Sequence, residues 1–167
     1  MGLPSAARLA FREMTDADLD DMAALLGDED VMRFYPRPRT HGESSQWITR
    51  NQQRYRDHGF GLWVISVRET GEFVGDCGLT FQHVDGVDEL EVGYHVRASM
   101  QGQGYGTEAA AASRDFARDV LKASRLIAII NPANVPSQRV ATKIGLTVEK
   151  RATAPNGAEA AIYAARL

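Results

Sequence analysis

Hydrophobic residues recur along the chain at two spacings, and each spacing predicts a different kind of element. Short apolar runs between turn residues predict strands, and they lie at 7–15, 61–68, 72–81, 89–96, 125–131, 146–153 and 160–167. Apolar residues three to four apart predict helices, which follow Thr15, cover about 43–56 and 109–120, and run from Asn134 to Gly145. The order β-α-α-β-β-β-α-β-α-β-β is typical of an α/β protein with a mixed sheet and helices on its faces.

Several residues are expected to mark the ends and faces of these elements. Thr15 and Asp18 have the spacing of a capping box at the start of the first helix. Residues 83–88 are predicted to form a loop between two strands, and Asn156-Gly157 a hairpin turn near the end of the chain. One face of the alanine-rich helix is expected to be buried, and it carries Ala109, Ala112, Phe116 and Val120.

Composition places the chain among soluble globular proteins and argues against several functions. With 44% hydrophobic and 25% charged residues, the 167 residues are expected to form one domain, 1–167. A net charge of −3 gives no reason to expect nucleic-acid binding. The single cysteine, Cys77, excludes an intramolecular disulfide and a cysteine zinc cluster, and no metal site is expected. No secretory signal is visible and the apolar run 126–130 is too short to cross a bilayer, so a cytoplasmic protein without a membrane partner is expected.

The stretch with the clearest functional signal places Gly102, Gly104 and Gly106 on alternate positions between a strand and the alanine-rich helix. The first N–H groups of a helix have no partner within it, and the helix dipole adds partial positive charge there. A turn without side chains exposes these groups and makes an anion site suited to phosphate. A mobile surface turn is the alternative. A Rossmann fingerprint is excluded because Thr107 and Ala109 stand where it needs glycine, and the chain has no Gly-Lys-Ser/Thr of a P-loop.

Two blocks of sequence resemble the acetyl-CoA-binding motifs of the GNAT N-acetyltransferase superfamily. In EVGYHVRASMQGQGYGTEA, the family pattern Gln/Arg-x-x-Gly-x-Gly/Ala is met by Gln101, Gly104 and Gly106. In NPANVPSQRVATKIGL, the family's following motif is met by Asn134, Ser137, Gly145 and Leu146. The residues EVGY and GYGTEA around the glycines, together with the segment VMRFYPRP, resemble the sequences of the RimJ/RimL-like branch. The predicted order of elements also agrees with the family over nearly the whole chain.

This resemblance implies a GNAT-like fold, with a central twisted mixed sheet of about six to seven strands and about four helices, and acetyl-CoA (coenzyme A) as the cofactor. It implies that the strand before the glycine turn splays from its neighbour, and that pantetheine binds the main chain of Tyr94, His95 and Val96. The pyrophosphate is expected on the amides of the turn, which consists of Gln101, Gly102, Gln103, Gly104, Tyr105 and Gly106. Asn134 is expected to contact the cofactor's arm, and it is also a good N-cap residue.

Acetyl transfer requires a neutral amine, and free amines are mostly protonated near neutral pH. Glu91 is the candidate base, directly or through a water, because period-two alternation places it on the same face as Gly93 in the strand that leads to the glycine turn. A solvated or salt-bridged glutamate is the alternative. Glu89 points the same way but lies farther from the turn. His95 is a candidate proton relay, although a hydrogen-bonded wall residue is the preferred interpretation.

The group that protonates the leaving thiolate is not assigned by the sequence. Many GNAT relatives carry a tyrosine where this chain has Ala141, four residues after the Ser/Ala position. Ser137 is the nearest hydroxyl of the motif: it positions the sulfur or donates a proton, or else it satisfies a backbone group at the helix start. Departure of the thiolate without an enzymic acid is a further alternative. Cys77 is interpreted as structural, because the neighbouring Asp76 disfavours a thiolate.

The acceptor side is predicted from the aromatic, irregular segment 31–56, which family analogy suggests as a lid. Aromatic residues that either line an acceptor cavity or belong to the core are Phe34, Tyr35, Tyr55 and Trp63. Three arginines between 33 and 39 fit either an acidic or peptide-like acceptor or a solvated basic face. The acceptor, a protein N-terminus or a small-molecule amine, stays open, as does the choice between monomer and homodimer.

The expected function is acetyl-CoA-dependent N-acetylation of a primary amine by direct attack in a ternary complex. Ala141 motivates a first alternative, a module that binds acyl-CoA with little or no turnover. A generic nucleotide-phosphate site at the glycine turn is a second alternative.

Overall fold

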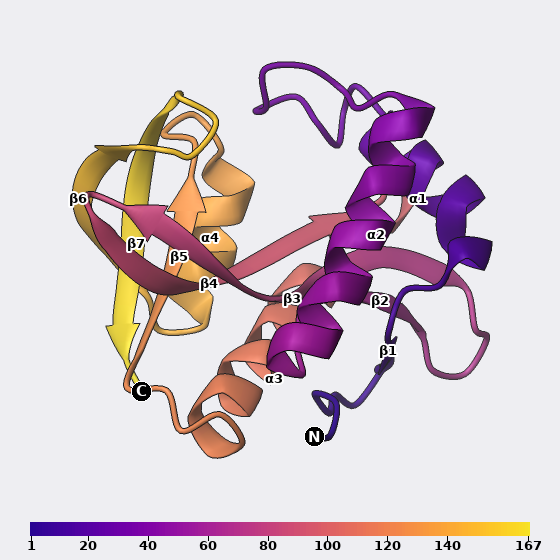
Figure 1. Ribbon diagram of the computed structural model, residues 1–167, viewed down its shortest axis with the longest axis horizontal. Coiled ribbons are helices and arrows are strands. Elements are labelled where there is room, and N and C mark those ends of the chain that lie inside the picture. Colours follow the sequence, from indigo (N-terminus) through magenta and orange to yellow (C-terminus); the bar gives the residue numbers. More distant parts are fainter.

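A seven-stranded mixed sheet and four α-helices make up the computed structural model, which describes residues 1–167 (Figure 1). The strands are β1 (Leu9–Arg12), β2 (Leu62–Val67), β3 (Phe73–Val84), β4 (Val87–Val96), β5 (Arg125–Ile130), β6 (Thr147–Thr153) and β7 (Glu159–Arg166). The helices are α1 (Leu19–Leu26), α2 (His41–His58), α3 (Tyr105–Asp119) and α4 (Val135–Lys143). The predicted order of elements and the mixed α/β fold class are confirmed.

The sheet is divided where β4 and β5 meet. The strand order is β1-β2-β3-β4-β5-β7-β6, and the β4–β5 pair alone is parallel. On one side β4 pairs with β3 along its whole length. On the other side the pairing with β5 is confined to Glu91 opposite Ile127. The two strands therefore diverge beyond Glu91, which is the splay that the sequence resemblance implied.

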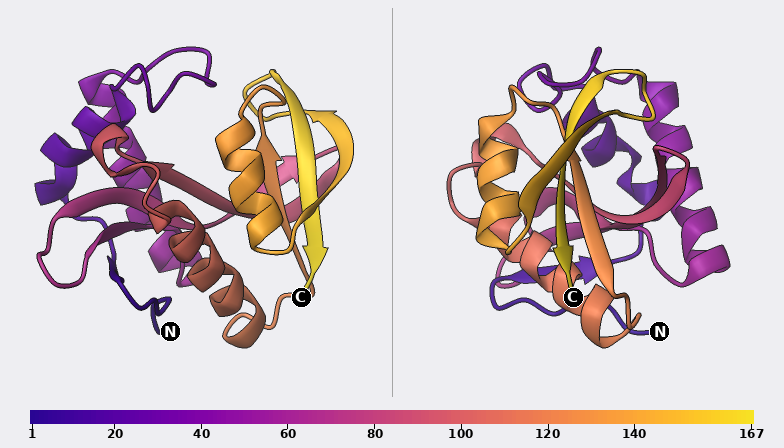
Figure 2. Two further views of the ribbon diagram at one scale, coloured as in Figure 1. Left: turned by 180° about the vertical axis from the view of Figure 1, so that it is seen from behind. Right: turned by 90° about the vertical axis from the view of Figure 1, so that its left-hand side faces the viewer.

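The helices cover opposite faces of β3 and β4. Trp47 on α2 donates its indole N–H to Asp76 at 3.0 Å, whereas Ser113 on α3 lies 3.4 Å from Sγ of Cys77. Because Asp76 and Cys77 are consecutive strand residues, these contacts fall on opposite faces of the sheet. In Figure 1 α2 lies in front of the sheet, and α3 comes to the front when the molecule is turned by 180° (Figure 2).

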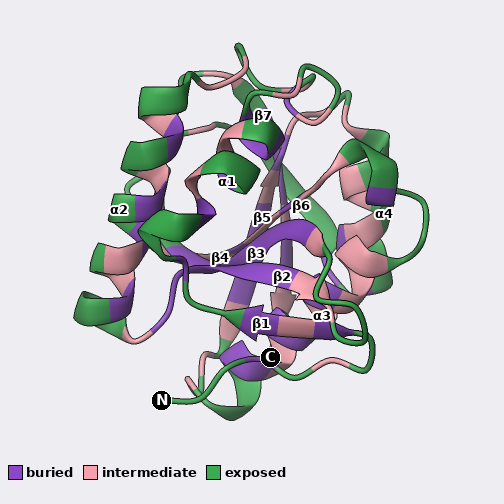
Figure 3. Ribbon diagram, turned by 90° about the vertical axis from the view of Figure 1, so that its right-hand side faces the viewer, coloured by how far each residue is buried: buried purple, intermediate pink, exposed green.

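Two details of the sequence prediction are wrong. Residues 83–88 are not a loop, because β3 continues to Val84 and β4 begins at Val87. The connection is the two-residue turn Asp85-Gly86, with φ of 49° and 80° at its two positions, and Asp-Gly between alternating hydrophobic residues is a strong signal for such a hairpin. Val120 is 46% exposed rather than buried, since α3 ends at Asp119 before the last turn reaches it. Figure 3 shows the central strands β2 and β3 largely buried, whereas α2 turns an exposed face outward.

Other local predictions are confirmed. The carboxylate of Asp18 accepts the N–H of Thr15 at 2.7 Å, as the capping-box spacing predicted. Ala109, Ala112 and Phe116 are buried on α3. None of the helices combines the length and the apolar character that a bilayer crossing requires.

Candidate active site

One cleft of about 590 Å³ runs along the β4–β5 divergence. Its lining residues come from the segment before α2, from α2 itself, from β3 and β4, from the glycine turn and from α4. Among the predicted site residues, those that line it are Glu91, Tyr94, His95, Val96, Gln101, Gly102, Gly104, Gly106, Asn134 and Ser137. Segments that are far apart in the sequence therefore contribute to one site.

The glycine turn presents a row of free backbone N–H groups. No N–H from Gly102 to Thr107 donates to another atom of the protein, and the first α3 bond across the turn is from Glu108 N to Gly104 O at 3.0 Å. Gly102 and Gly104 have φ of 77° and 84°, a conformation that favours glycine. Buried or ligand-facing amides without partners are costly unless an acceptor satisfies them, so this row is suited to an anion with several oxygens.

Arg8, just before β1, contacts both the glycine turn and the first residues of α3. Its Nη1 donates to the carbonyl of Gln103 at 3.0 Å, its Nε bonds Glu108 at 2.7 Å, and its guanidinium lies 4.6 Å from the ring centre of Tyr105. Gln103 and Tyr105 are the two residues of the predicted turn that do not line the cleft. These two residues can offer a ligand only their main-chain N–H groups.

The end of β4 leaves main-chain groups open toward the gap. Arg97 N donates to Val74 O at 2.8 Å, on the β3 side, so by alternation Val96 and Tyr94 turn their main-chain groups toward β5. The carbonyl of Val96 meets the Gln101 side chain there, with Nε2 donating at 2.9 Å. The main chain of His95 points toward β3, so His95 reaches the cleft only through its ring.

Glu91 is a free carboxyl in this cleft. Its Oε1 lies 3.4 Å from where a Cβ at Gly93 would stand, so the glycine leaves room for the side chain. Burial raises the pKa of Glu91 to about 8, and the charge of Arg54 opposes this rise without forming an ion pair. Glu89, by contrast, is tied to Arg125 at 3.0 Å. A carboxyl with a pKa near neutrality can both accept and release a proton at physiological pH.

Two hydroxyl groups face each other across the gap. Tyr94 Oη donates to the carbonyl of Ser137 at 2.9 Å and lies 3.0 Å from Ser137 Oγ. Asn134 caps α4, with its Oδ1 accepting the N–H of Ser137 at 3.1 Å. Ala141 is fully buried. The cleft thus receives a phenolic hydroxyl from Tyr94 on β4, whereas position 141 on α4 carries none.

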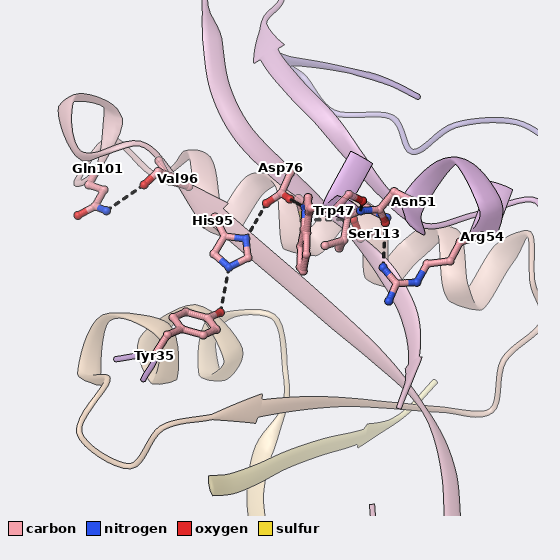
Figure 4. Close-up of polar contacts among 11 residues, drawn as sticks. Tyr35, Trp47, Asn51, Arg54, Asp76, His95, Val96, Gln101 and Ser113 are labelled. Carbon is pink, nitrogen blue, oxygen red and sulfur yellow. Dashed lines mark hydrogen bonds and ion pairs between the residues drawn. The ribbon is translucent and has the colours of Figure 1, made fainter. Parts of the chain in front are cut away.

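A chain of side-chain hydrogen bonds connects the sheet interior to the segment before α2 (Figure 4). Asp76, which is fully buried, bonds Nδ1 of His95 at 2.7 Å and accepts the indole N–H of Trp47 at 3.0 Å. His95 Nε2 then bonds the hydroxyl of Tyr35 at 2.9 Å. The expected hydrogen-bonded wall position of His95 agrees with this arrangement, and the Asp–His–Tyr chain also fixes the ring at the edge of the cleft.

Removing the carboxylate at the centre of this chain is expected to destabilise the fold. Asp76→Ala leaves two donors unpaired in the interior, so the free energy of unfolding should fall by about 3 kcal/mol and Tm by roughly 6–12 °C. Chemical denaturation measures this loss. The control is Asp88→Ala, which removes an exposed partner of His83 and should cost less than about 1 kcal/mol. Equal losses in the two variants would contradict the assigned role of Asp76.

The segment before α2 spans the cleft at its acceptor side. Phe34 and Tyr35 line the cleft, and Asn131, just after β5, donates to the carbonyl of Phe34 at 3.2 Å. Trp63 is fully buried in the core, and Tyr55 has its hydroxyl bonded to main-chain atoms of the interior. Of the four aromatic candidates, two therefore face the acceptor side and two are core residues.

Some lining residues were not selected from the sequence. They are Trp47 and Arg54 on the acceptor side and Arg139 and Lys143 on α4. Helical spacing alone places Trp47 and Arg54 on one face of α2 and Arg139 and Lys143 on one face of α4. This helical spacing can be recognised in the sequence, but it does not indicate which face of each helix lines the cleft.

Cys77 does not take part in the cleft. It is fully buried, and burial raises the pKa of its thiol to about 12. No group of three or more His, Cys, Asp or Glu side chains is arranged to hold a metal ion.

Comparison with known proteins adds four findings. A family model described as acetyltransferase (GNAT) domain matches residues 8–147. The uncharacterized protein YkkB of Bacillus subtilis (strain 168) is 34% identical over 144 residues, covering 86% of this chain and 84% of that protein. A solved acetyltransferase from Agrobacterium tumefaciens aligns with a TM-score of 0.86 and 24% identity over 100% of this chain and 95% of its own. RimL, described as a ribosomal L7/L12 alpha-N-protein acetyltransferase in complex with coenzyme A, aligns with a TM-score of 0.75 and 17% identity over 99% and 97%.

Proposed function

The chain belongs to the acetyltransferase (GNAT) family, and from that premise we propose that it transfers an acetyl group from acetyl-CoA to a primary amine by direct attack within a ternary complex. We take residues 1–167 as one catalytic domain. The observation that carries this proposal is the single cleft that brings the free amides of the glycine turn and the free carboxyl of Glu91 to one opening between β4 and β5.

The part of the cleft that is lined by the glycine turn and the end of β4 fits coenzyme A. The unpaired N–H groups from Gly102 to Thr107 would hold the pyrophosphate, and the main-chain groups of Tyr94 and Val96 would pair with the pantetheine arm. An added Cβ at Gly106 would stand 3.5 Å from the side chain of Val96, inside the space the arm needs. RimL, similar in fold, is described as bound to coenzyme A, which supports the same assignment. When bound, acetyl-CoA would supply the activated thioester.

Glu91 is proposed as the base that prepares the acceptor. It lies on the α2 side of β4, where an amine can enter beside Tyr35 and Trp47. Its carboxylate accepts a proton from the ammonium form, directly or through a water, and so frees the nitrogen lone pair. The alternative of a salt-bridged glutamate is not favoured, because no basic side chain pairs with this carboxyl.

The hydroxyl pair is proposed to serve the departing sulfur. Ser137 Oγ lies on the α4 side of the gap, and Tyr94 Oη stands 3.0 Å from it. Burial raises the pKa of Tyr94 above its ordinary value, so the phenol stays protonated, and its O–H bond to the carbonyl of Ser137 fixes this residue beside the gap. This arrangement supports Ser137 as the group that positions the sulfur or donates to it.

The test of this proposal is thiol release from acetyl-CoA across a panel of amines. Release that requires both acetyl-CoA and an amine supports the enzyme. Tight binding of coenzyme A without thiol release from any amine would support the module with little or no turnover. Preference for a nucleoside triphosphate over coenzyme A in calorimetry would contradict the cofactor assignment.

The rate is expected to depend on pH through Glu91. The folded-state pKa of this carboxyl is raised from 4.5 to about 8, and only the deprotonated form accepts a proton. With a saturating amine, kcat should therefore rise with pH between about 6 and 8.5, about tenfold per pH unit on the acidic limb. Steady-state rates in overlapping buffers measure this profile. A flat profile over that interval would exclude Glu91 as the titrating base.

A further inference from the structure

The arginines that line the cleft form no ion pair, whereas many of the arginines outside it do. Arg50, Arg56, Arg68 and Arg166 lie outside the cleft and also form no ion pair. Outside the cleft, arginines that form ion pairs with carboxylates are Arg8, Arg12, Arg37, Arg97, Arg114, Arg118, Arg125 and Arg151. Those that line the cleft are Arg33, Arg39, Arg54 and Arg139, and none of them has a carboxylate within ion-pair distance. Arg139 lies with Lys143 on α4, beside the proposed coenzyme A site. The other three lie on the acceptor side.

Arg39 is a partly buried cation without a polar partner. Its Nε is buried and makes no hydrogen bond, and no other atom of its guanidinium bonds the protein. The group lies 4.8 Å from the ring centre of Trp47, stacked on the wall of the cleft. Burial is the main cause that lowers its pKa, and Arg50 adds a repulsive charge. The two Nη groups, in contrast, are not buried and have no acceptor from the protein, so an anion that enters the cleft can accept hydrogen bonds from them.

Arg54 extends this cationic wall along α2. Its Nη1 bonds the neutral amide of Asn51 at 3.1 Å, and it has no carboxylate partner. Trp47 and Arg54 are seven positions apart, which places both on one face of the helix. Arg54 is close enough to Glu91 for their charges to interact, but it leaves that carboxyl unpaired.

The carboxylates that face this side do not neutralise it. Asp76 is occupied by His95 and Trp47, and Glu43 is held by Arg37 at 2.6 Å. Glu159, which also lines the cleft, is paired with Arg151 at 2.9 Å. Asp30 and Glu91 are the remaining carboxyls of the lining. The balance of charge next to the proposed base is therefore positive, which is unfavourable for an acceptor that carries several positive charges.

We propose that Arg39 forms an anion subsite that binds a carboxylate of the acceptor while the acceptor's amine faces Glu91, and that Arg54, a second unpaired arginine of the cleft, adds positive charge that favours such an acceptor. This inference rests on the proposed function and specifies its substrate class: an amine that carries a carboxylate, either a peptide with an acidic residue near its N-terminus or an acidic amino acid. The planar guanidinium group of Arg39 suits a carboxylate because it can donate two parallel hydrogen bonds. Polyamines fall outside this class.

Equilibrium binding to the coenzyme A-loaded protein tests the subsite without requiring turnover. Two acceptor pairs differ only in one carboxylate: the peptides Ser-Asp-Ala-amide and Ser-Asn-Ala-amide, and the single amino acids glutamic acid α-amide and glutamine α-amide, in which no α-carboxylate is present. In calorimetry, the acidic member of one pair should bind about ten- to hundredfold more tightly than its amide. The pair that shows the difference identifies whether the acceptor is a peptide or a free amino acid.

Variants connect that preference to the two arginines. Arg39→Gln should weaken binding of the acidic member about tenfold or more, Arg54→Gln should weaken it by a smaller factor, and each should change binding of the amide less than about threefold. Arg56→Gln is the matched control, since it removes a charge from α2 outside the cleft, where Arg56 bonds Gln53. It should leave the preference intact.

The outcomes separate this inference from the proposed function. Equal affinity for acid and amide in both pairs, tighter binding of spermidine, or equal losses for acid and amide in Arg39→Gln would overturn the subsite. Thiol release measured on the same samples reports the proposed function separately. A clear preference for the acid without thiol release would leave the subsite supported and contradict the transferase.

Discussion

Glu91→Gln is expected to lower kcat by about 10²–10⁴-fold with little change in affinity for coenzyme A. Glutamine keeps the size and polarity of the side chain but cannot accept a proton from the amine. The carboxyl reaches the cleft without an ion-pair partner, and burial holds its pKa at about 8, so no neighbouring group already occupies it. Because Glu91 is on the opposite face of β4 from Tyr94 and Val96, the coenzyme A site should not be affected. Steady-state kinetics and calorimetry measure the two quantities.

The stability of Glu91→Gln at high pH is the control that shows whether the variant is correctly folded. The raised pKa means that the folded state holds the proton of Glu91 more tightly than the unfolded chain does. Stability contributed by the protonated carboxyl is present below pH 4.5, its ordinary value, and is lost as pH rises through about 8. Glu91→Gln stays neutral, so it should be at least as stable as the wild type at pH 9. A slow variant that is also less stable at pH 9 would indicate structural damage and not the loss of a base.

Gly106→Val is expected to raise the dissociation constant of coenzyme A by roughly 100-fold or more. Gly106 is the second residue of α3 and does not have the positive φ of Gly102 and Gly104, so a side chain is compatible with its backbone. An added Cβ would meet Val96 and Val140 side chains at 3.5 and 3.9 Å, which are ordinary contact distances. The larger valine side chain would then project into the cleft between β4 and α4. The fold should tolerate the change, whereas the pantetheine arm should not.

A matched control comes from the corresponding position of another helix. Gly42 is the second residue of α2, and an added Cβ there would meet no atom within 4 Å. Gly42→Val should therefore leave the dissociation constant of coenzyme A unchanged within about twofold. If Gly106→Val binds coenzyme A as tightly as Gly42→Val does, the cofactor does not pass over α3 as proposed.

The fold could be predicted from the sequence because its signals are local. The change from strand to helix spacing, the Thr15–Asp18 capping pair and the glycines before α3 each depend on neighbouring residues. The Asp85-Gly86 turn also has a local signal in the sequence, although the loop predicted over 83–88 is longer than the turn that forms. Val120 was misplaced because the end of a helix is set within a turn or so by tertiary contacts, which spacing does not reveal.

The candidate site was only partly predictable from the sequence, because many of its contacts join residues that are far apart in the chain. The glycine turn and Glu91 lie on β4 and the turn after it, so one stretch of sequence contains both. The bond from Tyr94 to Ser137, in contrast, joins β4 to α4 across the gap. The Asp76–His95–Tyr35 chain and the exposure of Arg39 depend on how the segment before α2 crosses β4. Such long-range contacts leave no periodic signal in the sequence.

The central claim is that the main-chain amides after β4 hold the pyrophosphate of acetyl-CoA at the same opening that Glu91 reaches from the acceptor side. A crystal structure of the protein with coenzyme A bound tests it most directly. The predicted result has pyrophosphate oxygens within hydrogen-bond distance of N–H groups between Gly102 and Thr107, and the sulfur in the β4–β5 gap near Ser137. Pyrophosphate bound anywhere else, or a sulfur remote from that gap, would contradict both the cofactor site and the role assigned to Glu91.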